Sequence, residues 1–248
     1  MSLKNSSELN GKISIFDRKR ELIFPKKMTD DLAEFMGIMT GDGHISYHKY
    51  GRRTNYTITV TGNSETDLKY FEQRILPLFK KLFNLDLKIS KRKNEKTISV
   101  QTRSVGIYNF LLNMGLKSAP KDRIEIPRNV LNNGMIIHFI RGLFDTDGGL
   151  CLKKRYRDYH YYPVISLKQK SKIIITQVER ILKDLGFSFY SEYDVVTNDK
   201  RGFTSKGSRI YLYGMKNLEK WLDIIGFNNP KYTDKASHCL KLYGNGGI

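Results

Sequence analysis

The chain has 248 residues, with 43 Lys and Arg against 25 Asp and Glu, which gives a formal net charge of +18. A positive surplus of this size favours a polyanionic partner, and nucleic acid is the first candidate. An anionic membrane surface is disfavoured because the basic residues are not gathered on one amphipathic helix. The length allows one large domain or two domains of about 100 to 150 residues.

Cysteine content and the N-terminal sequence bear on the cellular compartment. Cys151 and Cys239 are too few for a disulfide framework, which indicates a reducing environment, and neither has a Cys or His at zinc-ligand spacing. The start, MSLKNSSELNGKIS, lacks the apolar core of a signal peptide, and no run of 18 apolar residues occurs. We therefore expect an intracellular protein that is not secreted and has no membrane partner. It would be cytoplasmic, or organellar in a eukaryote.

Two short stretches of the sequence repeat one pattern. LAEFMGIMTGDG covers residues 32–43 and IHFIRGLFDTDG covers residues 137–148, and a gapless alignment places Asp42 over Asp147. Each stretch has apolar residues at helical spacing and stops at an Asp-Gly pair, which predicts an amphipathic helix followed by a turn. The spacing of the two aspartates suits one small domain per stretch.

Small residues lie along one face of each predicted helix: Ala33, Gly37 and Gly41 in the first, Gly142 and Thr146 in the second. Gly inside a helix costs roughly 1 kcal/mol relative to Ala, so a stripe of small residues calls for a compensating gain. Close packing of two helix backbones supplies one, and the stripes therefore predict that the two helices pack together. Asp42 and Asp147 would then meet at the same end.

In the first half, the periodicity predicts successive elements after an N-terminal arm. Asp30 or Asp31 caps the first motif helix, which ends at Gly43. The elements that follow are strands at 44–50 and 55–62, a helix at 64–83 opened by a Ser64–Asp67 capping box and bent at Pro77, strands at 85–91 and 97–103, and a helix at 105–114.

The second half repeats this order. After the second motif helix we predict strands at 150–156 and 161–169, a helix at 171–185, strands at 187–195 and 208–213, and a helix at 216–225. The sequence therefore predicts an α+β fold of two pseudo-symmetric αββαββα halves. The expected boundaries are an arm at 1–29, the first half at 30–118, a linker at 119–134 and the second half at 135–248.

The two aspartates are the main candidates for chemistry. A single Asp-Gly pair after a helix is usually only a turn. Here the duplication, the small-residue stripe, the positive charge and the strand after each Asp favour a function. Two carboxylates near one pseudo-twofold axis would bind a hard divalent cation such as Mg²⁺. In a strongly basic protein, such a metal suits phosphodiester hydrolysis.

Both stretches resemble the LAGLIDADG motif of homing endonucleases. GLFDTDG at 142–148 is close to the consensus, whereas GIMTGDG at 37–43 has Thr40 in place of the earlier Asp, a helix-packing position in the family. The resemblance covers residues from about 30 to 240. It implies a monomeric, site-specific endonuclease whose two four-stranded antiparallel sheets form a DNA-binding saddle, with the motif helices at the centre. It also implies metal-dependent cuts, with Mg²⁺ or Mn²⁺, in both strands of a long asymmetric duplex site.

The resemblance also implies roles for individual residues. The metal ligands would be Asp42 and Asp147, with the backbone carbonyls of Gly41 and Thr146. Gln169 would order water in the second half, where the first half has Gly62 or Asn63; it could also be a plain strand-end residue. Lys117 (or Lys121) and Lys231 would face the scissile phosphate, although either could be a solvated surface charge.

The outward faces of the predicted strands would read the DNA. Arg, Lys, Gln and Thr suit base edges in the major groove, and further Lys residues suit phosphates. The candidates are His44, Ser46, His48, Thr57, Thr59, Lys88, Arg92, Gln101 and Arg103 in the first half, and Lys153, Arg155, Lys168, Arg209 and Tyr211 in the second. The histidines show no metal-ligand spacing, and His138 is expected to pack at the helix–helix interface.

Two other functions remain open. An intron RNA maturase or a DNA-binding regulator that does not cut would use the same fold, although such proteins commonly lose one metal aspartate and this chain keeps both. An intein-borne enzyme is a third reading. The chain starts at Met1, has no nucleophile-led splicing block and ends in GNGGI, so we expect a free-standing protein, with an intron as its source.

Overall fold

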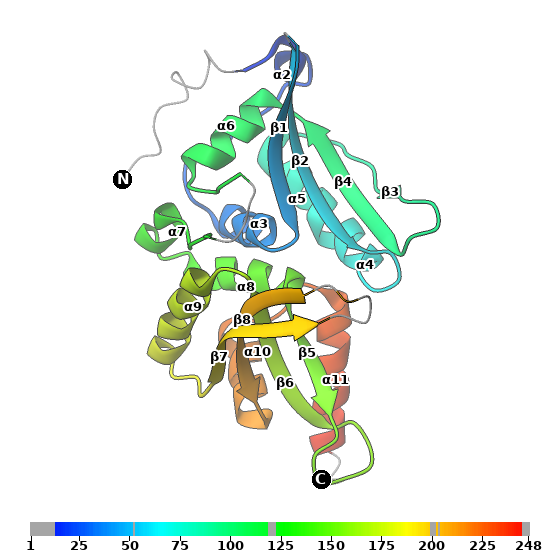
Figure 1. Cartoon of the computed structure of the whole chain (residues 1–248), viewed down its shortest axis with the longest axis vertical. Coiled ribbons are helices and arrows are strands. Elements are labelled where there is room, and N and C mark those ends of the chain that lie inside the picture. Colours follow the sequence, from blue (N-terminus) through cyan, green and yellow to red (C-terminus); the bar gives the residue numbers. More distant parts are fainter. Residues whose placement is uncertain (1–12, 52, 119–122, 199–201, 203, 245–248) are drawn as a thin grey trace. The chain divides into compact units, whose positions relative to one another are not determined.

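The computed structural model describes residues 13–51, 53–118, 123–198, 202 and 204–244. The chain divides into two compact units, which are Met1–Pro120 with Pro127–Leu143, and Lys121–Ile126 with Phe144–Ile248. Each unit holds one four-stranded antiparallel sheet covered by helices (Figure 1). The predicted α+β class and the two four-stranded sheets are confirmed. No helix within the described residues is long and apolar enough to cross a membrane.

Unit 1 contains one motif helix and the first sheet, in the order β1-β2-β4-β3. Its elements are α2 (Ile15–Lys19), α3 (Asp30–Thr40), β1 (Gly43–Tyr50), β2 (Arg53–Asn63), α4 (Leu68–Tyr70), the π-helical η2 (Phe71–Ile75), α5 (Leu76–Phe83), β3 (Ser90–Lys91), β4 (Thr97–Arg103), α6 (Val105–Asn113), α7 (Arg128–Asn132) and the first part of α8 (Ile136–Thr146).

Unit 2 begins within α8 and repeats the strand order as β5-β6-β8-β7. Its further elements are β5 (Gly148–Lys153), β6 (Tyr162–Gln169), α9 (Lys172–Asp184), β7 (Tyr190–Asn198), β8 (Thr204–Tyr213), α10 (Met215–Ile224) and α11 (Pro230–Gly244). The helix α11 was not predicted. Its buried residues Tyr232, Ala236 and Cys239 recur at helical spacing, and its first residue is Pro230, a residue favoured at the first helical position.

The two motif helices pack closely within unit 1. A Cβ built on Gly37 of α3 would lie 2.9 Å from the Leu143 nitrogen, and one on Gly142 of α8 would lie 3.0 Å from the Ile38 nitrogen. Such short distances to backbone atoms leave no room for a side chain. The prediction that small residues let these helices pack together is therefore confirmed for α3 and the part of α8 up to Leu143.

The N-terminus of α3 differs from the prediction. The cap is Thr29, whose hydroxyl accepts a hydrogen bond from the Leu32 N–H at 3.2 Å. Asp30 and Asp31 lie inside the first turn, where their charge is favourable to the helix dipole. The prediction of Asp30 or Asp31 as the cap is wrong, because a Thr one residue earlier takes the position.

Three further predictions for the first half need correction. The Ser64–Asp67 capping box is absent, since Asp67 instead accepts a hydrogen bond from the Asn63 N–H at 2.8 Å and the helix begins at Leu68. The helix then passes through a π turn, in which the Leu76 N–H bonds the Phe71 carbonyl, just before Pro77. The strand predicted at 85–91 is reduced to β3, because only Ser90 and Lys91 pair with β4.

The described part of the N-terminal segment packs against unit 1. Phe24 lies against Phe110 with ring centroids 5.6 Å apart. Asp17 in α2 is fully buried, and its carboxylate accepts a hydrogen bond from the Gly106 N–H at 3.1 Å, in the first turn of α6. Arg20 bonds Asp17 at 2.9 Å and the Thr102 hydroxyl at 3.1 Å. This segment is therefore packed against unit 1 and attached to it by hydrogen bonds from Asp17 and Arg20.

Candidate active site

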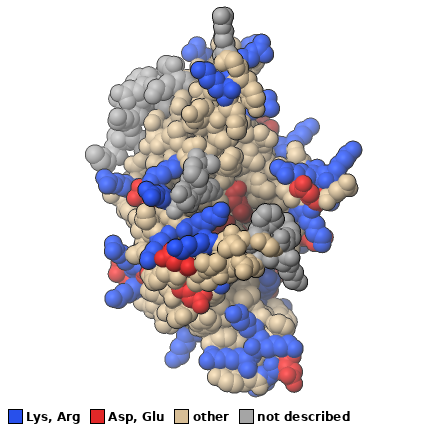
Figure 2. Space-filling view, in the orientation of Figure 1, with Lys and Arg blue, Asp and Glu red and all other residues tan. Residues whose placement is uncertain are grey.

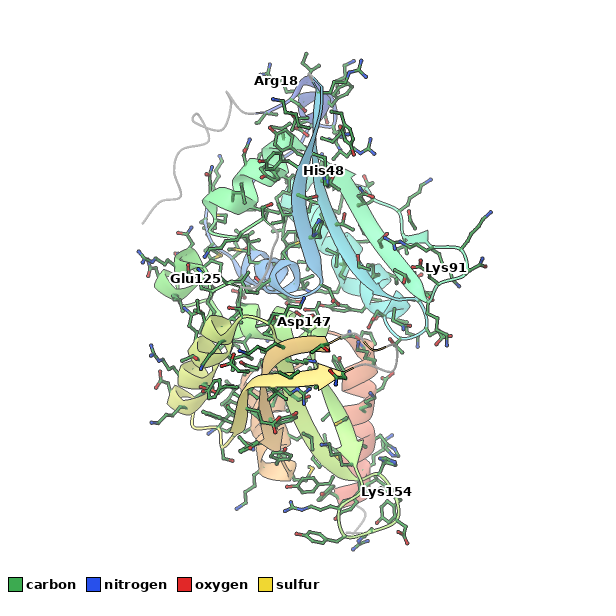
Figure 3. All side chains as sticks on the ribbon, in the orientation of Figure 1. Arg18, His48, Lys91, Glu125, Asp147 and Lys154 are labelled. Carbon is green, nitrogen blue, oxygen red and sulfur yellow. The ribbon has the colours of Figure 1, made fainter. Side chains whose placement is uncertain are left out.

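Asp147 lies in unit 2 between the end of α8 and the start of β5 (Figure 3). Its carboxylate accepts a hydrogen bond from the Nε2 of Gln169, the last residue of β6. Gln169 is 6% exposed, so its amide is held by its surroundings as well as by this bond. The structure therefore brings together two residues that the sequence analysis proposed for one site, and the amide fixes the orientation of the carboxylate.

The equivalent position in unit 1 has no such amide. Gly43 pairs with Val60 in the first sheet, as Gly148 pairs with Leu167 in the second, so Gly62 occupies the place of Gln169. A Cβ on Gly62 would lie 2.6 Å from the Phe71 ring, which fills the space. Of the two alternatives for the first half, Gly62 and Asn63, the strand register selects Gly62. The two Asp sites therefore differ in their immediate surroundings.

Asp145 links the second motif helix to the segment that follows α10. It is 1% exposed, its carboxylate accepts a hydrogen bond from the Asn228 N–H at 2.8 Å, and its carbonyl accepts one from the Asn229 side chain at 3.0 Å. Asn229 in turn accepts a bond from the Lys231 N–H at 3.2 Å. Asp145 thus fixes the backbone that carries Lys231, a role the sequence analysis missed.

Thr40 stands where the first motif would have this Asp. It is buried, and its hydroxyl donates to the Met36 carbonyl at 2.8 Å within its own helix. This local bond satisfies the Thr40 hydroxyl inside α3. The contrast between GIMTGDG and GLFDTDG in the sequence was the signal that could have identified the structural role of Asp145.

The helix α11 supports the backbone next to Asp147. The Tyr232 hydroxyl donates to the Gly148 carbonyl at 2.7 Å, and Gly149 leaves the space that this ring needs, since a Cβ there would lie 2.6 Å from the hydroxyl. The Lys231 ammonium lies over the same ring, 4.7 Å from its centroid. Tyr232 therefore connects α11 to the start of β5 by a hydrogen bond and also contacts the Lys231 side chain of its own helix.

The lysine proposed for the first half is exposed. Lys117 lies just after α6, and the neighbouring Ser118 hydroxyl donates to the Ile45 carbonyl at 3.0 Å, which attaches this segment to β1. Lys121, the competing residue, lies outside the described residues. The role of either lysine toward a phosphate stays a prediction.

The ligand chemistry at the ends of both motif helices fits a hard divalent cation. Asp42 and Asp147 are partly exposed and supply carboxylate oxygens, and Gly41 and Thr146 supply the preceding carbonyls. Such oxygen donors suit Mg²⁺ or Mn²⁺, which usually complete their coordination with waters and substrate phosphates. No group of three or more His, Cys, Asp or Glu side chains in the described part of the chain is arranged to hold a metal.

The outer face of the first sheet carries most of the predicted polar residues in cross-strand rows. His44, Thr59 and Gln101 form one row, and Ser46, Thr57 and Arg103 form the next. His44, His48, Gln101 and Arg103 are exposed, whereas Ser46 is buried.

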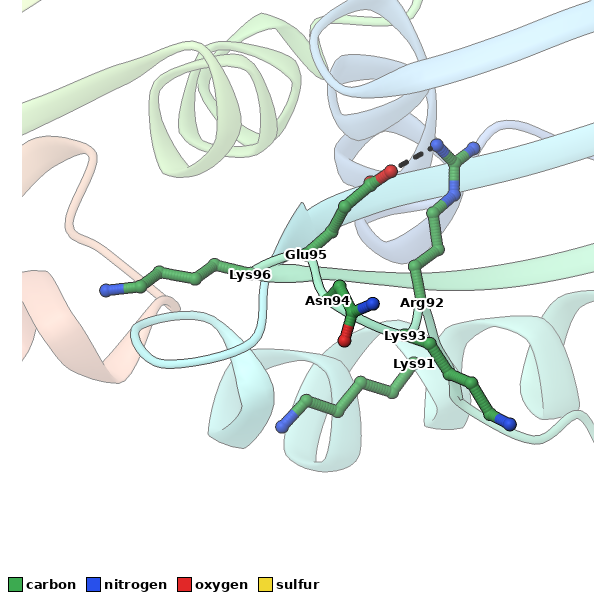
Figure 4. Close-up of a pocket in the computed structure, with 6 residues that line it drawn as sticks. All are labelled: Lys91, Arg92, Lys93, Asn94, Glu95 and Lys96. Carbon is green, nitrogen blue, oxygen red and sulfur yellow. Dashed lines mark hydrogen bonds and ion pairs between the residues drawn. The ribbon is translucent and has the colours of Figure 1, made fainter.

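Two predicted DNA-binding residues of unit 1 lie outside its strands. Lys88 precedes β3, and Arg92 follows it in the turn Lys91–Lys96, which lines an open pocket (Figure 4). In this turn the Arg92 guanidinium pairs with Glu95 at 3.4 Å. The prediction that Lys88 lies on a strand is wrong, because β3 begins only at Ser90, whereas Arg92 lies in the turn that follows the predicted strand at 85–91. Both side chains are exposed.

On the second sheet, Lys168 and Arg209 are cross-strand neighbours, and Lys153 lies over the Tyr211 ring at 5.9 Å. Arg209 faces Glu192 at 3.8 Å. Arg155 was predicted on a strand, but β5 ends at Lys153, so Arg155 lies in the loop that follows. Figure 2 shows Lys and Arg side chains gathered over this loop and over the turn after β3.

The histidine predicted to pack between the motif helices does lie there. His138 on α8 places its Nε2 3.4 Å from the Asp30 carboxylate on α3. On the same helix, Arg141 lies 3.8 Å from the fully buried Glu34, which also bonds Arg74 at 2.6 Å. Charged contacts therefore join α3 and α8 beside the glycine stripe.

Residues 135–226 match the family of the LAGLIDADG-like domain. The homing endonuclease I-DmoI, solved with DNA and Mn, superposes with a TM-score of 0.54 and 23% identity, covering 79% of this chain and 96% of that one. The LAGLIDADG homing endonuclease I-GzeII with its DNA target superposes with a TM-score of 0.55 and 13% identity, covering 89% and 92%. The chain therefore has the fold of the LAGLIDADG homing endonucleases, and the resemblance predicted from its two motifs is confirmed.

Among curated proteins, the replication factor C small subunit of Methanocaldococcus jannaschii is 23% identical over 217 residues, which is 86% of this chain and 10% of that protein. A glutamine–fructose-6-phosphate aminotransferase from the same organism shares a segment of similar length. The chain spans 10% to 21% of the length of the first curated relatives it matches. Proteins with different names share this segment, so the similarity concerns the segment and not the activity named for each whole protein.

Proposed function

We propose that this protein is a site-specific homing endonuclease that makes metal-dependent double-strand cuts in a long asymmetric DNA site. The observation that carries the proposal is the duplicated Asp at the end of a motif helix, once in each unit, with the Asp147 carboxylate oriented by Gln169. A carboxylate held in one orientation by a neighbouring amide is suited to binding a metal ion. Carboxylates facing phosphates repel them unless a cation lies between the two.

Different residues of the chain would bind the metal, position its ligands and contact the phosphate. Asp42 and Asp147, with the carbonyls of Gly41 and Thr146, would hold Mg²⁺ or Mn²⁺. When bound, such a metal activates water and offsets the charge that develops on the phosphate. Gln169 holds the Asp147 carboxylate in place, and Asp145 fixes the backbone that carries Lys231. Lys231 and Lys117 would place a positive charge next to the scissile phosphate.

The outer faces of the two sheets would bind the duplex. His44, Thr59 and Gln101 on one sheet, and Lys168 and Arg209 on the other, present hydrogen-bonding groups in cross-strand rows. I-DmoI and I-GzeII, which share the fold, were solved in complex with DNA, and I-DmoI also with Mn. We infer double-stranded DNA as the partner of this chain, which would act as a monomer because both motifs lie in one polypeptide. We further propose that the protein is intron-encoded.

A cleavage selection tests the proposal. The protein is incubated with a randomised or genomic duplex library, with Mg²⁺ or with EDTA, and the ends that it generates are sequenced. Recovery of one long asymmetric site, cut in both strands only with Mg²⁺, is the expected result. If DNA were retained on the protein and never cut, the endonuclease proposal would be wrong, and a maturase or DNA-binding regulator would take its place. Structured intron RNA would then be the ligand to test.

A further inference from the structure

The helix α11 covers the free edge of the second sheet. Among the described strands β5 pairs with β6 alone, so the carbonyls on its other side need partners outside the sheet. The Tyr232 hydroxyl donates to the Gly148 carbonyl at 2.7 Å, and the Lys235 ammonium donates to the Leu150 carbonyl at 3.4 Å. The two donors are three residues apart, on one face of α11, which runs alongside β5 in Figure 1. The helix therefore supplies hydrogen-bond donors along this edge.

The segment that opens α11 holds the chain on both sides of Asp147. Before Asp147, residues 228 and 229 bond the carboxylate and the carbonyl of Asp145, at 2.8 Å and 3.0 Å. After Asp147, the Tyr232 hydroxyl bonds the carbonyl of Gly148. Five consecutive residues of the chain therefore contact the positions two before and one after the proposed metal ligand.

The ring of Tyr232 occupies a space that only glycine leaves open. A Cβ on Gly149 would lie 2.6 Å from the Tyr232 hydroxyl and 2.9 Å from two ring carbons. Gly148 is also close to β6, since a Cβ there would lie 2.8 Å from the Ser166 carbonyl. Tyr232 itself is 6% exposed. The backbone that follows Asp147 is therefore held between β6 and a buried hydroxyl.

Unit 1 offers a comparison for one of the two bonds to β5. The motif alignment places Ile45 of β1 over Leu150 of β5. The Ile45 carbonyl accepts a hydrogen bond from the Ser118 hydroxyl at 3.0 Å, as the Leu150 carbonyl accepts one from Lys235. The edge carbonyl at this position is thus satisfied in both units. The Lys235 bond therefore represents edge capping in general, whereas the Tyr232 bond lies next to the proposed metal ligand.

We propose that Tyr232 is a positioning residue for the metal site of unit 2. Its hydroxyl holds the backbone after Asp147, so that the Asp147 carboxylate and the Thr146 carbonyl keep the orientation that a divalent cation requires. The inference rests on the proposed function and adds a residue of α11 to that site. Gln169 fixes the carboxylate and Tyr232 fixes the backbone that carries it. Loss of the hydroxyl widens the range of ligand orientations and lowers metal affinity, although Tyr232 does not touch the metal.

Three full-length variants test the proposal. Tyr232→Phe removes the hydroxyl and keeps the ring that packs against Gly149. Tyr243→Phe makes the same chemical change near the other end of α11. Lys235→Met removes the comparable bond from α11 to the Leu150 carbonyl. Melting temperatures confirm that all three proteins remain folded.

The first measurement is hydrogen–deuterium exchange of the metal-free protein without DNA, read by mass spectrometry. Tyr232→Phe is expected to speed exchange of the backbone amides at residues 146–149 by about tenfold, because one hydrogen bond that holds this segment is lost. Exchange at residues 41–44 of the first motif stays as in wild type. Both control variants keep wild-type exchange at residues 146–149. A Tyr232→Phe protein with wild-type exchange there would overturn the inference.

The second measurement is cleavage of the selected duplex across a Mg²⁺ titration, with duplex binding in EDTA. Tyr232→Phe is expected to raise the Mg²⁺ concentration for half-maximal rate by about tenfold and to keep duplex affinity within about twofold of wild type. Both controls keep the wild-type Mg²⁺ dependence. An unchanged Mg²⁺ dependence in Tyr232→Phe, or an equal shift in Lys235→Met, would overturn the inference. If wild-type protein cut no duplex, the proposed function itself would fail, and the exchange measurement would show separately whether Tyr232 holds the backbone.

Discussion

At the scale of single residues, the two aspartates at the centre of the account differ in what surrounds them. Asp147 has the Gln169 amide, whereas the matching place beside Asp42 is Gly62, with Phe71 filling the space. An amide that fixes a carboxylate ligand raises the affinity of a metal site without touching the metal. The side chain of Gln169 should therefore matter more for the metal than for DNA binding.

Replacing Gln169 with Ala is expected to lower the cleavage rate by about 10- to 100-fold and to raise the Mg²⁺ concentration needed for half-maximal rate. Duplex affinity in EDTA should stay within about twofold of wild type, since the side chain is buried. Cleavage rates measured across a Mg²⁺ titration, with binding by gel shift, check both statements. A variant with wild-type rate and wild-type Mg²⁺ dependence would remove Gln169 from the site.

Asp17 shows how one buried carboxylate connects the N-terminal segment to unit 1. Burial alone raises the pKa of this carboxyl, but hydrogen bonds from Ser104, Gly106 and Ser14 outweigh it and lower the pKa below its ordinary value of 3.8. A group whose pKa is depressed by folding stabilises the folded state above the unfolded pKa. That contribution is lost as the pH falls below 3.8 toward the folded pKa.

We expect Asp17→Asn to destabilise the protein by about 1 to 3 kcal/mol at neutral pH. The difference in melting temperature between wild type and this variant should be constant above pH 5 and should shrink below pH 3.8. Thermal melts followed by circular dichroism from pH 3 to pH 7 test this. Asp223→Asn, which changes an exposed carboxylate in α10, serves as the control with little effect. A difference that grew at low pH would contradict the assignment.

At the scale of elements, the glycine stripe of α3 and α8 is the feature that most restricts substitution. In an isolated helix, Gly to Ala is favourable by roughly 1 kcal/mol, but a Cβ on Gly37 would meet the backbone of Phe139 and Leu143. Backbone atoms of a packed helix cannot give way as a flexible side chain can. The steric cost should therefore exceed the gain in helix propensity.

Gly37→Ala is expected to destabilise the protein by about 1 to 3 kcal/mol, measured as a shift in the urea midpoint. Gly244→Ala at the end of α11 is the matched control, because a Cβ there meets nothing within 4 Å. This control should be neutral or slightly stabilising. An equally stable or more stable Gly37→Ala protein would show that α3 and α8 do not need their close approach.

The repeated elements could be predicted because their signals are local. Leu32, Phe35, Met36 and Met39 form a helical stripe in the sequence, and all four are buried. The roles that were missed depend on long-range contacts. Asp145 bonds Asn228 and Asn229 more than 80 residues away, and no local pattern indicates such partners.

Local competition explains the remaining differences between prediction and structure. The carboxylate of Asp67 bonds the backbone of Asn63 rather than capping a helix as predicted. The strand predicted at 85–91 is short for the same kind of reason, since its apolar residues Leu85 and Leu87 lie in an irregular segment before β3, without ladder partners among the described residues. Sequence periodicity therefore predicts the order of helices and strands, but it does not predict which hydrogen-bonding groups pair in the folded protein.

At the scale of the whole molecule, two units with the same strand order share one helix and a surplus of 18 positive charges. Each unit contributes one motif Asp and one outer sheet face. Neither unit alone holds both carboxylates, so a double-strand cut at this site would need both units. The requirement follows because the motif that ends in Asp42 and Asp147 occurs once in each unit.

The most direct test uses the selected DNA site with Asp42→Asn and Asp147→Asn, each measured for duplex binding in EDTA and for strand cleavage with Mg²⁺. The change from Asp to Asn keeps the side chain's size and removes the anionic oxygen ligand. Both variants are expected to bind the duplex within a few-fold of wild type, and neither is expected to produce a double-strand break. A variant that cut both strands at the wild-type rate would contradict the assignment of the two aspartates as metal ligands.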